Sequence, residues 1–213
     1  MRPQSVFVYG AGGHAKVVMD VLERDGRHSV TFLVDDDVGR WGSTVGGHQV
    51  RGGRDALLRE RDATGIAAGV VAIGHNAARD DVASALVAGG FSLVVAVHPS
   101  AQIAASARLG QGTVVMANAV VNPGVSIGSN VIVNTGANVD HDCVVGDAVH
   151  IAPGATICGG VRVGARSRVY AGATVINDIT IGVDATIGAG AVVIRDVPDG
   201  ATVVGVPARR IER

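Results

Sequence analysis

Aromatic and charged side chains are both scarce in this chain of 213 residues. Phe, Tyr and Trp make up 3% of the residues, and Asp, Glu, Lys and Arg make up 17%. So few aromatic residues are unusual for an ordinary globular core, where these side chains supply much of the buried area. With apolar residues at 47%, the low charge excludes a disordered, solvated chain.

The chain also has no large excess of positive or negative charge, few cysteines and no long apolar runs. The net charge of −1 provides neither a basic surface for nucleic acid nor a polybasic patch for a membrane. Two cysteines make no disulfide framework, and no apolar run approaches the length of a membrane span. The first residues lack the layout of a signal peptide. We therefore expect a cytoplasmic protein with no nucleic-acid or membrane partner.

The chain is rich in glycine, with 31 residues against 6 prolines, and a six-residue repeat fills its second half. Every sixth residue from Ile103 to Val193 is Ile, Leu or Val, which gives sixteen consecutive positions without a slip in phase. Four residues after each of them stands a residue that is never charged. A period of six matches neither an α-helix nor a coiled coil, and a flat strand alternates every two residues.

We interpret the repeat as a hexapeptide solenoid, in which each hexad makes one short strand and one corner and three hexads make one triangular coil. The aliphatic residue points inward, and the small residue lies where the corner is tight. The residue after the aliphatic one is often Gly or Asn, as at Gly110, Gly128 and Asn134. We expect that residue to adopt the unusual backbone angles of the turn. Sixteen hexads over residues 103–198 correspond to about five coils.

The first half has the alternating strands and helices of a small α/β domain with a parallel sheet. Strands are expected at residues 6–9, 29–34, 69–73 and 93–97, and helices at 16–24, 54–61 and 78–87. The region is too short for a two-halved Rossmann domain, and Pro99 marks the junction because proline cannot continue a central strand. We therefore expect an α/β domain at residues 1–98, a β-helix at 99–198 and a C-terminal tail at 199–213.

A glycine-rich turn follows the first strand of this domain. Residues 10–15 read GAGGHA and fit the pattern G-x-G-x-x-A between a strand and a helix. Glycines let the backbone approach a phosphate, and the helix N-terminus supplies amide donors. Residues 35–37 are all Asp and end the second strand, where ribose hydroxyls are usually held. The pattern by itself is compatible with a nucleotide site or with a structural turn.

Outward-facing histidines of the solenoid are candidates for acid–base chemistry. Such chemistry needs a group that takes up a proton and donors that stabilise a developing oxyanion. His141 occupies an outward hexad position, and Asp142 beside it is able to orient an imidazole. From the residues alone, His141 is either a base or a surface histidine, and Asn134 is either functional or a residue favoured at corners.

Several motifs together resemble those of the left-handed β-helix sugar acetyltransferases. They are GAGGHA at 10–15, FLVDDD at 32–37, AIGHNAAR at 72–79, VHPSA at 97–101, VDHDCVVGDAVHIAPGA at 139–155 and GVPARRI at 205–211. The chain is most similar to the N-acetyltransferases of nucleotide-linked 4-amino-sugars, of the bacillosamine and perosamine type, and next to the sialic-acid O-acetyltransferases. The resemblance covers essentially the whole chain.

The resemblance implies a function and roles for individual residues. It implies transfer of an acetyl group from acetyl-CoA to the 4-amino group of a nucleotide-linked sugar by a homotrimer, without a metal. His141 matches the general base, Asp142 its acidic partner and Asn134 a residue near the reacting groups. Acetyl-CoA contacts are implied for His150, Gly159, Ala171 and Ala189, and nucleotide-sugar contacts for Gly10, Ala11, Gly12, His14, Asp35 and Asp36. His75 stands where the family often has Asp.

Other functions fit parts of the sequence. The G-x-G-x-x-A turn is typical of dinucleotide oxidoreductases, but the half-size domain and the long solenoid argue against one. A γ-class carbonic anhydrase needs three zinc-binding histidines, whereas the hexads hold only His141 and His150. A non-catalytic assembly protein has no need of an exposed His–Asp pair. O-acetylation of sialic acid or another sugar remains the main alternative, and the residues reveal neither the nucleotide nor the sugar.

Overall fold

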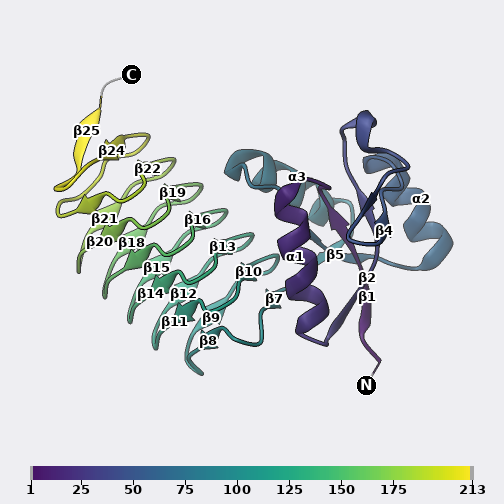
Figure 1. Ribbon diagram of the computed structural model, residues 1–213, viewed down its shortest axis with the longest axis horizontal. Coiled ribbons are helices and arrows are strands. Elements are labelled where there is room, and N and C mark those ends of the chain that lie inside the picture. Colours follow the sequence, from purple (N-terminus) through teal and green to yellow (C-terminus); the bar gives the residue numbers. More distant parts are fainter. Residues whose placement is uncertain (1, 212–213) are drawn as a thin grey trace. The chain divides into compact units, whose positions relative to one another are not determined.

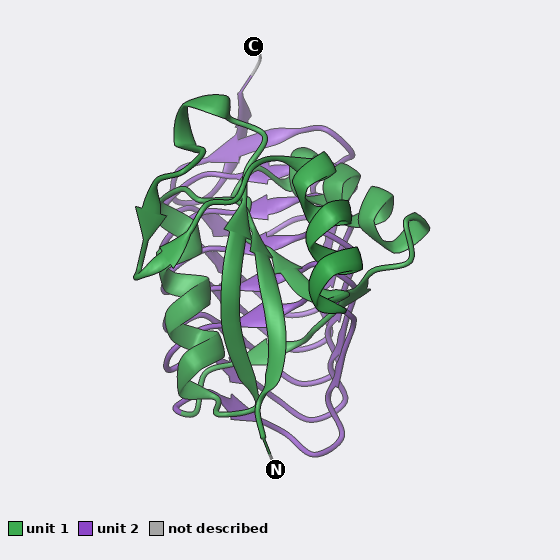
Figure 2. Ribbon diagram, turned by 90° about the vertical axis from the view of Figure 1, so that its right-hand side faces the viewer, with its two compact units in different colours: residues 1–99 green, residues 100–213 purple. Residues whose placement is uncertain are grey.

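The computed structural model describes residues 2–211, and the chain divides into two compact units, Met1–Pro99 and Ser100–Arg213 (Figures 1 and 2). Unit 1 is an α/β domain, and unit 2 is a β-solenoid. No helix in the described part of the chain is both long enough and apolar enough to span a membrane.

Unit 1 contains a four-stranded parallel sheet in the order β2-β1-β5-β6. Its strands are β1 (Gln4–Tyr9), β2 (His28–Val34), β5 (Ala68–Val71) and β6 (Ser92–Leu93), and its helices are α1 (Gly13–Arg24), α2 (Arg54–Thr64) and α3 (Asn76–Ala88). Consecutive residues of β1 and β5 are buried, which is typical of parallel strands covered on both faces. The α/β domain with a parallel sheet is therefore confirmed.

Two parts of unit 1 differ from the sequence prediction. The strand expected at 93–97 is split, because only Ser92 and Leu93 pair with β5, and a separate short strand β7 (Ala96–Val97) follows. Between β2 and α2 the structure has a short 3-10 helix, η1 (Val38–Arg40), and a hairpin of β3 (Thr44–Val45) and β4 (His48–Gln49). The hairpin turns at two glycines with positive φ, a turn type that suits a two-residue hairpin.

All three phenylalanines of the chain lie in the core of unit 1. Phe7 stacks on Phe32 with ring centroids 6.4 Å apart, and it meets the edge of Phe91 at 5.5 Å. A Cβ atom on Gly69 would lie 2.6 Å from the Phe7 ring, so the glycine in β5 makes room for that ring. The scarcity of aromatic residues in the sequence therefore reflects a solenoid that is built almost without them.

Unit 2 consists of short strands, one in each hexad. They are β8 (Gln102–Ile103), β9 (Arg108–Leu109), β10 (Val114–Val115), β11 (Val120–Val121), β12 (Ser126–Ile127), β13 (Ile132–Val133), β14 (Asn138–Val139), β15 (Val144–Val145), β16 (His150–Ile151), β17 (Thr156–Ile157), β18 (Arg162–Val163), β19 (Arg168–Val169), β20 (Thr174–Val175), β21 (Thr180–Ile181), β22 (Thr186–Ile187) and β23 (Val192–Val193), followed by β24 (Thr202–Val204) and β25 (Arg209–Ile211). The predicted aliphatic residue is the second residue of β8 to β23, and it is buried from Val115 to Val193.

Each strand pairs in parallel with the strand three hexads later, so three hexads make one coil. Val121 pairs with Val139 on one face, and Ile127 pairs with Val145 on the next. The face that runs from β8 to β23 has six strands, which gives about six turns rather than the expected five. Sixteen hexads divide unequally among three faces, so the face from β8 to β23 has six strands while the face from β9 to β21 has five. On the third face, β24 lies beyond the regular hexads, pairs with β22 and extends the stack. β24 and β25 lie within the segment 199–213 that was expected as a tail.

The unusual backbone angles of the corners lie at a different hexad position from the predicted one. Positive φ occurs three places after the inward aliphatic residue, as at Asn130 and Asp142, and not one place after it. The glycine one place after it serves another purpose, because a Cβ atom on Gly110 would lie 2.5 Å from the Gly128 backbone. The expectation of strained turn angles there is therefore wrong, and glycine is needed because neighbouring coils approach closely.

Small polar residues are accommodated inside the prism by a recurring hydrogen bond. The hydroxyls of Thr113 and Ser167 donate to carbonyl oxygens fifteen residues later, at 2.8 and 2.6 Å. The Cys143 thiol makes the equivalent contact with the carbonyl of Cys158 at 3.1 Å. Burial raises the pKa of the Cys143 thiol to about 11, which disfavours the reactive thiolate. Cys143 is thus a core residue, as expected.

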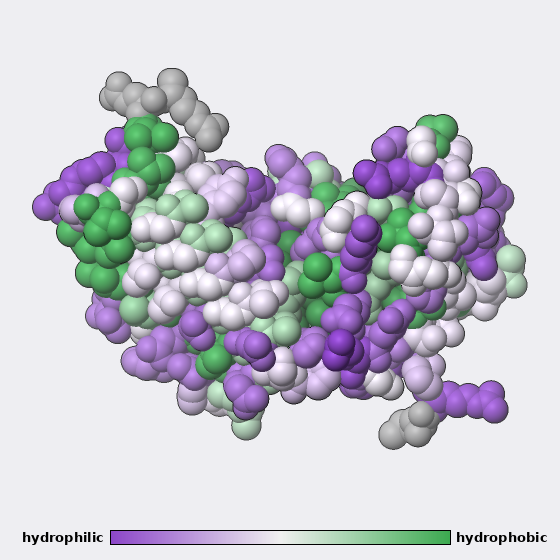
Figure 3. All heavy atoms as spheres, in the orientation of Figure 1, coloured by the Kyte–Doolittle hydropathy of each residue, from purple (hydrophilic) through white to green (hydrophobic). Residues whose placement is uncertain are grey.

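One face of the solenoid is nearly neutral in hydropathy except near its C-terminal end. Figure 3 shows a mostly pale, near-neutral wall over the coils and apolar side chains gathered over β24 and β25. The exposed apolar residues of this region are Val204, Val206 and Ile211, of which Val206 is 72% exposed.

Candidate active site

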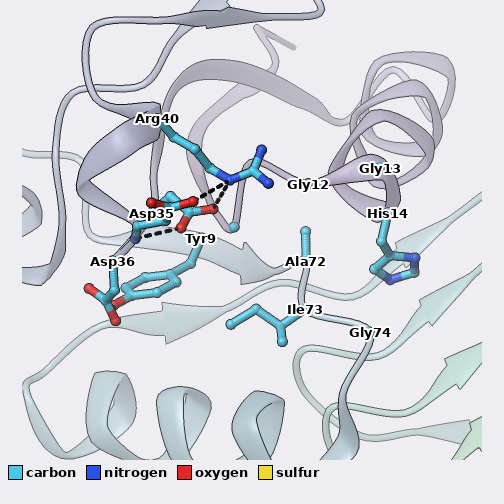
Figure 4. Close-up of a pocket in the computed structure, with 12 residues that line it drawn as sticks. Tyr9, Gly12, Gly13, His14, Asp35, Asp36, Arg40, Ala72, Ile73 and Gly74 are labelled. Carbon is cyan, nitrogen blue, oxygen red and sulfur yellow. Dashed lines mark hydrogen bonds and ion pairs between the residues drawn. The ribbon is translucent and has the colours of Figure 1, made fainter.

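A cavity of about 460 Å³ opens in unit 1 beyond the carboxyl ends of β1, β2 and β5 (Figure 4). Open α/β sheets usually bind their ligands at this edge. The residues that line it are Tyr9, Gly10, Gly12, Gly13, His14, Asp35, Asp36, Asp37, Arg40, Ala72, Ile73 and Gly74. The structure therefore brings together the predicted turn and the predicted acidic residues.

The glycines of the GAGGHA turn have two different roles. Gly10 has φ of +108°, and a Cβ atom there would lie 2.8 Å from the Ala72 carbonyl oxygen, so the fold itself requires glycine. A Cβ atom on Gly12 or Gly13 would meet no atom within 4 Å. Gly12 is the N-cap of α1 and provides no side-chain cap. The positive end of α1 is therefore available at the cavity, as anion-binding turns require.

Asp35 ties the glycine turn to the end of β2. Its carboxylate accepts hydrogen bonds from the backbone N–H of Ala11 at 2.7 Å and of Asp37 at 2.9 Å. Arg40 donates to the Ala11 carbonyl at 3.0 Å, and its Nε lies 3.3 Å from the Asp37 carboxylate. Both oxygens of Asp35 are thus engaged with the backbone, which holds the loop in shape around the cavity.

Asp36 points toward a second cavity. It accepts a 2.6 Å hydrogen bond from the Tyr9 hydroxyl, and burial together with Asp36 raises the pKa of Tyr9 to about 12, so the phenol stays protonated. The second cavity measures about 400 Å³, and Asp36, Trp41, Arg54 and Arg59 are among its lining residues. Asp36 therefore lies on the wall between the two cavities and lines both of them.

His14 is held neutral on the wall of the first cavity. Burial and, secondarily, the charge of Arg79 lower the pKa of His14 to about 4. Arg79 is 1% exposed and donates to the Ile73 carbonyl and to Asn76 at 3.0 Å each. His75 accepts a 3.3 Å hydrogen bond from the Ala78 backbone and caps α3. The loop at 73–76 is thus shaped by a buried arginine and a capping histidine.

On the solenoid, His141 and Asp142 form a pair at the corner between β14 and β15. Nδ1 of His141 lies 2.9 Å from the Asp142 carboxylate, and the side chains are 57% and 74% exposed. A carboxylate only accepts, so Nδ1 carries the proton and Nε2 of the neutral ring keeps its lone pair. The Asp142 hydrogen bond, followed by the charge of Asp140, raises the pKa of His141.

Sequence reasoning missed two residues that support this corner. The Asp140 carboxylate accepts a 2.7 Å bond from the Asn122 amide and a 2.8 Å bond from the backbone N–H of His141. These bonds, that of Asn122 first, lower the pKa of Asp140, so it stays ionised beside the histidine. Asn122 stands eighteen residues before Asp140, and the spacing of one coil is the signal that could have found the pair.

Asn134 is placed with His150 and not with His141. The Asn134 amide nitrogen lies 3.0 Å from Nε2 of His150, at the face of β13 and β16. Ala171 and Ala189 are exposed at the corners after β19 and β22, on the same side of the prism as Asn134. Gly159 lies at the corner of His141 instead. Within one chain the predicted catalytic and acetyl-CoA residues are therefore split between two corners, with the face of β14 between them.

Metal ligation finds no support among residues 2–211. Within that range, no three His, Cys, Asp or Glu side chains come together in an arrangement that could hold a metal ion.

Comparisons with known proteins match both units. Residues 5–86 match the family described as the PglD N-terminal domain, and residues 142–177 match the bacterial transferase hexapeptide family. UDP-N-acetylbacillosamine N-acetyltransferase of Bacillus subtilis (strain 168) is 35% identical over 115 residues, which are 54% of this chain and 52% of that protein. The match thus spans about half the length of this relative.

Solved structures are similar over nearly the whole chain. A mutant of perosamine N-acetyltransferase from Caulobacter crescentus, in complex with CoA and GDP-perosamine, is 44% identical with a TM-score of 0.94, covering 98% of this chain and 97% of that one. The acetyltransferase domain of PglB from Neisseria gonorrhoeae FA1090, in complex with acetyl coenzyme A, is 41% identical with a TM-score of 0.90, covering 98% and 100%. This chain therefore belongs to the PglD-type family of hexapeptide-repeat acetyltransferases.

Proposed function

We propose that this chain transfers the acetyl group of acetyl-CoA to the 4-amino group of a nucleotide-linked amino-sugar, with His141 as general base. The observation that carries the proposal is the hydrogen bond of 2.9 Å between His141 Nδ1 and Asp142. It leaves Nε2 as the proton acceptor of an exposed histidine. The similar proteins that act on or bind amino-sugars favour nitrogen over oxygen as the acetylated atom.

The chemistry requires one proton acceptor and one orienting group. The neutral amine of the sugar forms a bond to the acetyl carbon, the bond from that carbon to the CoA sulfur breaks, and the sulfur leaves as the thiolate. Nε2 of His141 takes the proton that the amine loses. Asp142 keeps the ring in the tautomer with a free Nε2 and stabilises the imidazolium that forms. We propose that no metal takes part, because a neutral amine and a thioester need no metal to react.

Unit 1 is proposed to hold the nucleotide part of the acceptor. The uncapped N-terminus of α1 at Gly12 suits the phosphates, and the acidic residues Asp35 and Asp36 suit ribose or base donors. Gly10 and Ala11 shape the turn, and neutral His14 is able to donate or accept a hydrogen bond without adding charge. The comparison structure with GDP-perosamine supports this class of ligand.

The solenoid is proposed to be left-handed, to form a trimer and to bind acetyl-CoA between two copies. His150, Ala171, Ala189 and Gly159 are the proposed contacts. Because His141 and His150 occupy different corners of one chain, a complete site needs the His141 corner of one copy beside the His150 face of its neighbour. Such a contact joins two different surfaces, and heterologous contacts of this kind close into a ring when the rotation between copies allows it.

A panel of UDP-, GDP- and dTDP-linked 4-amino-sugars assayed with acetyl-CoA tests the function. Release of free CoA thiol and a product heavier by one acetyl group are the expected readouts. In His141→Ala the turnover number should fall roughly 10²- to 10⁴-fold, the usual contribution of a general base. Near-wild-type turnover in this variant, or no acetylation of any amino-sugar, would overturn the proposal.

A further inference from the structure

We propose that Gly159 is a positioning residue for the base, because only a residue without a side chain leaves space for the His141 imidazole. The inference rests on the proposed function and goes beyond any contact that Gly159 makes with acetyl-CoA. It concerns three stacked positions on one corner of the solenoid, namely His141, Gly159 and Asn177, which are eighteen residues apart.

The hexad pattern gives no reason for glycine at this position. Gly159 stands two places after the inward residue Ile157, and the equivalent position in the sixteen hexads holds no other glycine. The residues there are Ala105, Gln111, Ala117, Pro123, Ser129, Thr135, His141, Asp147, Pro153, Gly159, Ala165, Ala171, Asn177, Val183, Ala189 and Arg195. Since alanine, valine, proline and charged residues all fit this place in the coil, the fold does not require glycine.

Neither of the two common reasons for glycine in this solenoid applies to Gly159. It is not among the residues with positive φ, in contrast to the neighbouring Gly160. No backbone atom is among the three nearest to a Cβ built on Gly159, in contrast to Gly110. The closest atoms to a Cβ built on Gly159 are instead Cε1 and Nε2 of His141, at 2.6 and 2.7 Å, followed by the Asn177 amide nitrogen at 3.2 Å.

The imidazole therefore lies directly on Gly159. Gly159 is buried although it stands at a corner position, while His141 itself is exposed. A methyl group at this place would push the ring away, because the end of a side chain yields more easily than the backbone. Asn177 bounds the same space from the next coil and limits where the methyl group can go. The displaced ring would lose its aligned bond to Asp142, and Nε2 would leave its position.

Gly159→Ala tests the inference in the intact enzyme. The turnover number should fall about 10- to 100-fold, as expected for a base displaced by about 1 Å, with a smaller change in the KM for acetyl-CoA, which Gly159 is also proposed to contact. The pKa of His141, measured by NMR titration of its ring protons, should fall toward the ordinary value because the Asp142 bond that raises it is weakened. A merely structural role of Gly159 would not move this pKa.

Ala165→Val is the matched control. It adds bulk at the same hexad position, and Val183 shows that the next coil of the same corner accepts valine. This variant should keep wild-type turnover, thermal stability and His141 pKa. The inference is overturned if Gly159→Ala keeps the turnover number and the His141 pKa, or if it only raises the KM for acetyl-CoA. The NMR titration needs no substrate, so it tests the positioning role even if no amino-sugar is acetylated.

Discussion

The carboxylate of Asp142 lies 2.9 Å from Nδ1 of His141, although Asp142 has the positive φ of +59° that ends the corner. Asp tolerates this backbone conformation better than most residues. The same residue thus serves the turn and the histidine: its backbone reverses the chain, and its carboxylate orients the ring. Chemistry is placed at this corner without any distortion of the repeating coil.

The raised pKa of His141 predicts a specific pH dependence of turnover. The base must be neutral, and its pKa lies above the ordinary imidazole value of 6.5. Turnover should therefore be low in acid and rise as the pH increases through the raised pKa. Asp142→Asn removes the main cause of the shift, so the acid limb should move to lower pH while the plateau falls. Rate profiles from pH 5 to 9 check this, and an unmoved acid limb in the variant contradicts the assignment.

Much of the solenoid could be predicted from the sequence, because its period is local. The residue that points inward recurs every sixth place, and each aliphatic residue from Val115 to Val193 is buried. The end of the stack could not be predicted in the same way. β24 pairs with β22 at a spacing of sixteen residues instead of eighteen, so it leaves no trace in the hexad count.

The candidate site was predictable in its residue types and less so in its partners. His141 and Asp142 are adjacent in the chain, so Asp142 was expected as a group able to orient the ring, and the structure shows their bond. The bond between Asn134 and His150 joins residues that are sixteen positions apart and lie on neighbouring coils. The bond between Tyr9 and Asp36 joins the end of a strand to a loop. Such contacts depend on how elements pack. The need for glycine at position 159 likewise becomes visible only once the His141 ring is placed in the structure.

Val145 and Val144 provide a paired test of the inward-facing position. Val145 is 2% exposed and lies between Ile127 and Val163 of the neighbouring coils, whereas Val144 is 40% exposed. Val145→Asp would bury an unpaired charge and should cost on the order of 3–5 kcal/mol of unfolding free energy. Val144→Asp should change it little. Thermal and urea unfolding measure both, and equal stability of the two variants would contradict the register.

The separation of His141 and His150 on one chain predicts complementation between inactive variants. His141→Ala and His150→Ala, each assayed well below the KM for acetyl-CoA, should be weakly active. If equal amounts of the two variants are unfolded and refolded together, about three quarters of the trimers contain both variants. Each mixed trimer has one intact site among its three, so roughly a quarter of the wild-type number of sites should return. Separately refolded variants that are then assayed together serve as the control. No gain on co-refolding would place the whole site within one chain.

Gly12→Val should separate the two substrates. A Cβ atom on Gly12 meets no protein atom within 4 Å, and Gly12 lines the cavity of unit 1, so the added side chain would take up ligand space without disturbing the fold. Affinity for the nucleotide-sugar should fall at least about 10-fold, because the backbone no longer approaches the phosphates, while acetyl-CoA affinity stays the same.

Asp35→Ala should act in the same direction by releasing the bond to the Ala11 N–H. Asp62→Ala, whose side chain is 74% exposed and lines neither cavity, is the control for loss of a carboxylate. Isothermal titration with each ligand measures the effect. If Gly12→Val and Asp35→Ala bind the nucleotide-sugar normally and lose CoA instead, the GAGGHA turn is the CoA site, and the acceptor binds on the solenoid.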